Sequence, residues 1–161
     1  MTKTHTISAT AADPEVAAGT AQFLAPVVLG LQALAVNGKQ AHWNVRGANF
    51  IAIHELLDEV VTHAQASADE AAERIVALGL PIDARVATVA EKATATAVPA
   101  GFTPWEQQVA AVVADIDAVL PDVQAAIDGL DEVDLTSQDI AIAIKASLEK
   151  DRWFLSAHLA S

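Results

Sequence analysis

Side chains that commonly bind transition metals are concentrated in one stretch of this 161-residue sequence. Two histidines and three carboxylates stand there: His42, His54, Asp58, Asp69 and Glu73. Asp58 follows His54 by four residues and Glu73 follows Asp69 by four, a spacing that places each pair on one face of an α-helix. Imidazole and carboxylate side chains together can bind several divalent metal ions. Because the chain has no cysteine, any metal site must use histidine, aspartate and glutamate.

The helices that position these residues can be read from their boundary signals and apolar periodicity. The predicted long helices cover about 14–44, 50–78, 103–129 and 136–159, and the connection at 81–101 contains a short helix at 86–92. Asn49 and Thr103 are the expected N-caps of the second and third long helices. We therefore expect an all-α, ferritin-like four-helix bundle with a long crossover connection. It occupies 13–161, after a flexible N-terminal tail at 1–12.

The two halves of the ligand pattern are too far apart to bind one ion within a single chain. A helix rises ~1.5 Å per residue, so Asp58 and Asp69 lie about 16 Å apart along its axis, and His54 and Glu73 about 30 Å. A single ion with ligand bonds of ~2.0–2.2 Å cannot reach both ends. Either these are two unrelated surface pairs, or a twofold axis places one end against the other end of a second copy. His42, across the turn, can join the His54 end.

The spacing of the five ligands resembles the ferroxidase signature of the Dps family, the DNA-binding proteins from starved cells, also called mini-ferritins. The flanking segments KQAHWNVRGANF, IHELLDE and ADEAAERI resemble the same family, and EKDRWFLSAHL resembles its last helix. The resemblance covers about 15–160 and is strongest at 39–79.

The resemblance implies a hollow homododecamer of four-helix bundles with iron sites shared across twofold interfaces. His42, His54 and Asp58 would come from one chain, and Asp69 and Glu73 from its partner. The implied reaction is Fe(II) oxidation, preferably by hydrogen peroxide, with storage of ferric mineral in the cavity. Consuming iron and peroxide together would protect the cell from oxidative damage.

The resemblance also suggests roles for residues outside the ligand set. Trp43 is a possible electron donor, or alternatively an apolar anchor at the interface. Glu55 and Glu59 are candidate carboxylates for mineral nucleation in the cavity. Asp134 and Asp139 are candidates for an iron-uptake pore at a threefold axis, with an ordinary solvated loop and helix cap as the alternative.

The ligand set also allows a second kind of chemistry. A metal held by histidine and carboxylates can lower the pKa of its bound water and promote attack on an amide or ester. A metal-dependent hydrolase, for example of N-acylated amines, is therefore the alternative function, since a fold does not fix a function. A purely structural, DNA-compacting protein is a third hypothesis.

Charge and composition favour some partners over others. The formal net charge is −12. Twelve copies would carry roughly −144, which makes direct binding to DNA phosphates doubtful. The longest apolar run, 21–36, is shorter than the ~20 residues of a membrane span, and the N-terminus lacks a signal-peptide pattern. We therefore expect a cytoplasmic protein with no membrane partner.

Overall fold

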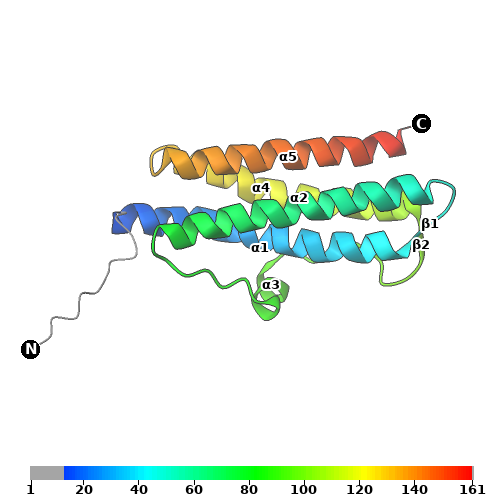
Figure 1. The fold of residues 1–161 in the computed structure, drawn as a ribbon, viewed down its shortest axis with the longest axis horizontal. Helices are drawn as coiled ribbons and strands as arrows, with labels where there is room; N and C mark the ends of the chain where they lie inside the picture. Colours follow the sequence, from blue (N-terminus) through cyan, green and yellow to red (C-terminus); the bar gives the residue numbers. More distant parts are fainter. Residues whose placement is uncertain (1–12, 161) are drawn as a thin grey trace, which may run out of the picture.

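The computed structural model describes residues 13–160, so the tail expected at 1–12 lies outside the described residues. Four long helices run along one axis: α1 (Pro14–Asn44), α2 (Phe50–Ala77), α4 (Trp105–Leu130) and α5 (Leu135–Leu159). Figure 1 shows that α1 and α2 form one antiparallel hairpin and that α4 and α5 form a second. The crossover between the hairpins carries the short helix α3 (Val86–Lys92). The four-helix bundle with a long crossover is confirmed.

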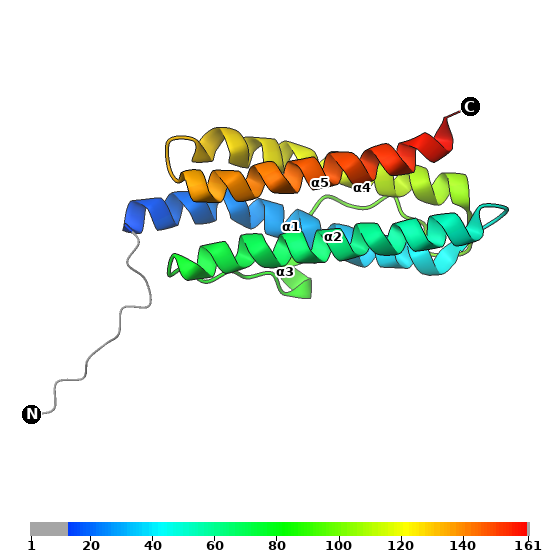
Figure 2. The same cartoon turned by 45° about the horizontal axis from the view of Figure 1, so that its top comes forward.

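The two hairpins lie side by side, with α1 against α2 and α4, and α2 against α5 (Figure 2). The turn from α1 to α2 lies at one end of the bundle, beside the start of α4. The end of α2 lies at the opposite end, beside the start of α5. The two halves of the ligand pattern, both carried mainly by α2, are therefore held at opposite ends of the bundle.

The turn after α1 is fixed by a short strand and a glycine. Strand β1 (Val45–Arg46) pairs in parallel with β2 (Thr103–Pro104), which comes directly before α4. Gly47 follows with φ +122°, a conformation that side chains with a Cβ rarely adopt, and a Cβ there would lie 3.0 Å from Trp105. Glycine is thus required where the chain reverses between the two histidine-bearing helix ends.

The first residue or the cap of three helices differs from the sequence prediction. Thr103 does not cap α4, because it lies in β2, and α4 begins at Trp105 after Pro104. Asn49 precedes α2 but makes no side-chain capping bond. Helix α5 begins at Leu135, one residue earlier than expected, because Asp134 is its N-cap and accepts a hydrogen bond from the Ser137 backbone N–H at 3.1 Å. For α4 the pairing of Thr103 with Val45 replaces the expected cap, whereas the α5 cap is a local contact between Asp134 and Ser137.

The apolar side chains of the long helices form a single core between the two hairpins. Its largest fully buried members come from all four helices: Leu24, Leu31, Leu34, Ile53, Leu57, Ile75, Ile116, Leu130, Ile144 and Leu155. Helix α1 is long and apolar enough to cross a membrane by length and composition, with a mean hydropathy of 1.5 over its most apolar window. In this fold the apolar face of α1 packs against α2 and α4 instead.

Candidate metal centre

His42 and His54 hold each other in place across the turn between α1 and α2. The His42 ring donates from Nδ1 to the backbone carbonyl of His54 at 2.7 Å, and the His54 ring donates from Nδ1 to the carbonyl of His42 at 2.9 Å. The two rings stack with their centroids 3.6 Å apart and their planes 21° apart. The sequence prediction that His42 joins the His54 end is confirmed by this contact.

These reciprocal hydrogen bonds determine which ring nitrogen can bind a metal. A carbonyl oxygen can only accept, so Nδ1 must carry the proton in both neutral rings. The Nε2 lone pairs of His42 and His54 are then free to act as ligands. Histidines that bind metals usually donate their other ring N–H to a carbonyl or carboxylate, which fixes the ring orientation. Both histidines therefore have the geometry of prearranged ligands.

Asp58 lies one helical turn after His54 and forms an ion pair with Lys39 of α1. The hydrogen bond from Lys39 is the main cause that holds the pKa of Asp58 below its usual value, and the charges of Lys39 and of the two histidines act in the same direction. The Asp58 side chain is half exposed. This end of α2 thus carries two imidazoles and, one helical turn from His54, an ionised carboxylate, which are ligand types that fit iron.

Asp69 and Glu73 lie farther along α2, exposed and one turn apart. Neither carboxylate has a hydrogen bond or ion pair among residues 13–160. Within that same range, no three histidine or acidic side chains lie close enough together to hold a metal ion. One chain therefore brings His42 and His54 into contact and carries Asp58 one helical turn farther along α2, but it does not by itself assemble a three-ligand site.

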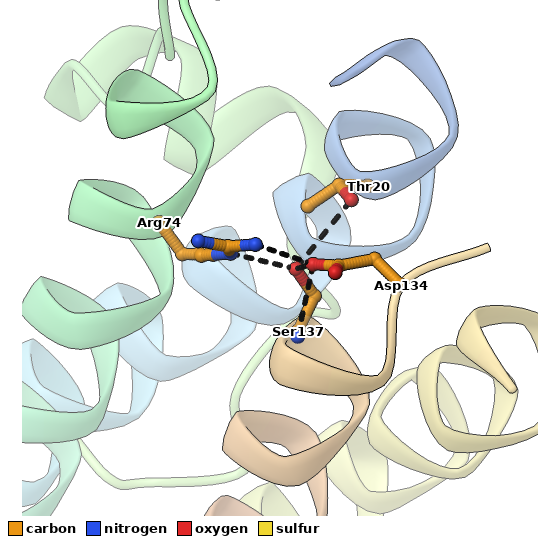
Figure 3. Close-up of polar contacts among 4 residues, drawn as sticks. All are labelled: Thr20, Arg74, Asp134 and Ser137. Carbon is orange, nitrogen blue, oxygen red and sulfur yellow. Dashed lines mark hydrogen bonds and ion pairs between the residues drawn. The ribbon is translucent and has the colours of Figure 1, made fainter. Parts of the chain in front are cut away.

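Asp134, an expected pore residue, is occupied by contacts within its own chain (Figure 3). Arg74 donates to Asp134 at 2.6 Å and to the Ser137 hydroxyl at 2.9 Å, and Thr20 lies 3.5 Å from that hydroxyl. Partial burial would raise the pKa of Asp134, but hydrogen bonds from Ser137 and Arg74 outweigh it and lower the pKa. The Arg74 side chain is only 22% exposed, because its contacts with Asp134 and Ser137 hold it between α2 and the start of α5.

The other residues singled out in the sequence are exposed. Trp43 follows His42 at the end of α1 with 61% of its surface exposed. Glu55 and Glu59 line a groove of about 480 Å³ between α2 and α5, together with Trp153, Phe154 and His158. Asp139 lies on the exposed side of α5, near its start. Among residues 13–160, none of these exposed side chains forms a hydrogen bond or an ion pair with a residue of the candidate metal centre.

Sequence reasoning missed a second buried polar contact. Asp151 of α5 is only 2% exposed, and the His63 Nδ1 of α2 lies 3.0 and 3.1 Å from its two carboxylate oxygens. Burial is the main cause that raises the pKa of Asp151, and His63 opposes it. The signal was present, since Asp151 falls between Leu148 and Leu155 on the buried face of α5.

Comparison with known proteins places this fold and site in a family. A family model described as a ferritin-like domain matches residues 28–161, so the chain belongs to the ferritin-like proteins. Among these it belongs to the Dps family. The chain is 37% identical to the DNA protection during starvation protein of Mycolicibacterium smegmatis over 123 residues, covering 76% of this chain and 67% of that protein.

Further relatives agree with this assignment. The DNA protection during starvation protein of Agrobacterium fabrum is 37% identical over 127 residues, covering 78% of each chain. The structure of Dps from Microbacterium arborescens in the high iron form has a TM-score of 0.91 and 75% identity, over 93% of this chain and 98% of that chain. Mycobacterium smegmatis Dps has a TM-score of 0.87 and 32% identity, over 94% and 92%. The resemblance to the Dps family is therefore confirmed, and iron storage with ferroxidase activity is the general role of that family.

Proposed function

We propose that this protein oxidises Fe(II) at sites shared between two copies of the chain and stores the ferric product in a hollow homododecamer. The observation that carries the proposal is the pair His42 and His54, whose Nδ1 atoms are both bonded to backbone carbonyls. Asp58 follows His54 by one helical turn, and the remaining ligands are out of reach on the same helix. Membership of the Dps family, whose general role is iron storage, supports the same conclusion.

A twofold axis between antiparallel α2 helices would complete two equivalent sites. It would bring Asp69 and Glu73 of one copy against the histidines and Asp58 of the other, as an isologous contact does. Each site would then have two imidazole and three carboxylate ligands. The carboxylates would stabilise the higher charge of Fe(III), and the neutral imidazoles would keep Fe(II) bound before oxidation.

We propose hydrogen peroxide as the preferred oxidant. Two Fe(II) ions each give up one electron, the O–O bond of one peroxide molecule accepts both, and with two protons its oxygens leave as two water molecules. Iron and peroxide are removed together, so less hydroxyl radical can form and the cell is protected. Trp43, next to His42, is positioned to supply an electron when iron is limiting.

We do not expect this protein to bind DNA directly. The net charge of −12 opposes contact with DNA phosphates at physiological salt. Protection would therefore act through iron and peroxide chemistry in the cytoplasm. Retention of DNA by the purified protein in a gel-shift at ~0.1 M salt would contradict this part of the proposal.

The test is an anaerobic titration with Fe(II), followed by peroxide and measurement of ferric absorbance. The wild type should oxidise a fixed number of Fe(II) ions per chain and elute as a large oligomer. The double variant His42→Ala with Asp69→Ala should lose this rapid phase. His158→Ala with Asp122→Ala removes the same two residue types from exposed positions outside the proposed ligand set and should retain it. Equal rapid oxidation by both double variants would refute the site.

A further inference from the structure

Lys39 contacts the candidate metal centre in a way that the proposed reaction leaves unexplained. It lies on α1, one helical turn before His42, and its ammonium forms an ion pair with Asp58 across the α1–α2 interface. The side chains are 34% and 51% exposed, so the pair lies at the surface of the half-site. The cation that neutralises Asp58 in this structure is thus part of the chain itself.

An ammonium and a metal ion compete for the same carboxylate. Asp58 contributes one negative charge, and the Lys39 ammonium offsets it. A divalent ion bound to Asp58 would lie within a few ångströms of the ammonium, where like charges repel strongly. A metal ion on Asp58 therefore weakens the ion pair with Lys39.

We infer that Lys39 is the counter-ion of the metal-free half-site and that Fe(II) displaces it from Asp58 on binding. The inference rests on the proposed function, because it assumes that Asp58 is a ligand. Lys39 is a positioning residue in this scheme: it holds the Asp58 carboxylate beside the histidines until metal arrives. It also gives selectivity by charge, since a monovalent cation gains nothing by replacing an ammonium and a divalent cation does.

The affinity of the half-site for a divalent probe tests the displacement. Zn(II) serves as the probe because it binds histidine and carboxylate without redox chemistry, and isothermal titration calorimetry gives its dissociation constant. Lys39→Met keeps the length of the side chain and removes the competing charge, so Zn(II) should bind about two- to fivefold more tightly, the range set by an exposed ion pair. A purely structural role for Lys39 predicts unchanged or weaker binding.

Three variants separate the possible outcomes. Lys145→Met makes the same change in net charge at an ion pair on α5, with Glu149, and should leave the Zn(II) affinity unchanged. Lys39→Gln provides a second neutral side chain if Lys39→Met folds poorly. Asp58→Asn should weaken Zn(II) binding whichever residue stands at position 39. Unchanged binding by Asp58→Asn would refute the metal site itself, whereas loss of binding there without a gain in Lys39→Met would refute only the displacement.

A crystal structure of the wild-type protein with Zn(II) gives a direct measurement. With metal on Asp58, the Lys39 ammonium should lie farther from the carboxylate than the ~4 Å limit of an ion pair. An ammonium still bonded to a metal-bound Asp58 would overturn the inference.

Discussion

The two ends of helix α2 carry the two halves of the candidate iron site in different ways. At the first end the ligands themselves are fixed: His42 and His54 bond to each other's backbone, and Lys39 holds Asp58. At the second end Asp69 and Glu73 stand exposed on the helix surface. Their neighbour Arg74 is held in place at this end by an ion pair with Asp134. The histidine end is thus arranged within one chain, whereas Asp69 and Glu73 have no hydrogen bond or ion pair among residues 13–160 to fix them.

Mixing two inactive variants gives the largest expected effect. His42→Ala with His54→Ala disables the first half-site, and Asp69→Ala with Glu73→Ala disables the second, so each homogeneous assembly should lose rapid Fe(II) oxidation. Co-assembly at equal amounts should restore about one quarter of the sites. Random isologous pairing gives about half of the pairs one chain of each variant, and one of the two sites in such a pair has both halves intact. The ferric absorbance formed by assemblies refolded from a mixture of the two variants measures the restored activity. Activity that stays absent in verified mixed assemblies would contradict shared sites.

Two glycines allow the ends of α2 to be compared directly. Gly47 and Gly79 both have positive φ, 122° and 97°. Alanine at either position should lower the free energy of unfolding by about 1–2 kcal/mol, the cost of the left-handed conformation. Only Gly47→Ala should also weaken Zn(II) binding, by about tenfold, because it disturbs the turn that orients the histidines. Equal Zn(II) affinities in the two variants would show that the turn does not set the histidine geometry.

Arg74→Met tests the fixed neighbour at the second end. It leaves Asp134, whose side chain is 17% exposed, without its ion-pair partner, and should cost about 1–3 kcal/mol at pH 7 by urea unfolding. The pKa of Asp134 is lowered in the folded chain, so its stabilisation is present above the unfolded value of ~3.9 and is lost as the pH falls through the folded pKa. The gap between wild type and variant should therefore narrow below about pH 4.

Arg152→Met is the matched control for this prediction, because Arg152 pairs with the exposed Asp117. It should change the stability little at any pH. A gap between wild type and Arg74→Met that stays constant down to pH 3 would show that the variant acts through packing and not through the charge of Asp134.

The smallest effect is expected for Trp43→Phe. The indole is 61% exposed and contributes no ligand, so Fe(II) stoichiometry and the oxidation rate with excess peroxide should stay within about twofold of the wild type. The tryptophan radical signal, measured by electron paramagnetic resonance at low iron, should disappear. A tenfold fall in rate with intact iron binding would give Trp43 a larger role than proposed.

The sequence predicted the elements and the separation of the ligands well, because both follow from helical periodicity. The rise per residue alone placed Asp58 and Asp69 too far apart for one ion. Contacts between distant segments were not readable in this way. The β1–β2 pair moved the start of α4 past Thr103, and the partner of Asp151 lies 88 residues away at His63. A helical wheel predicts which face of the helix carries a residue. Which side chain of another helix contacts that residue depends on how the helices pack.

The histidine pair has a consequence for the order in which the particle forms. His42 and His54 are separated by only twelve residues, so their contact is available as soon as the α1–α2 hairpin has folded. The complete site, by contrast, would appear only when two chains associate. Iron that binds the paired chains better than the separate ones must by mass action favour association. Iron would then promote assembly of the oligomer that stores it.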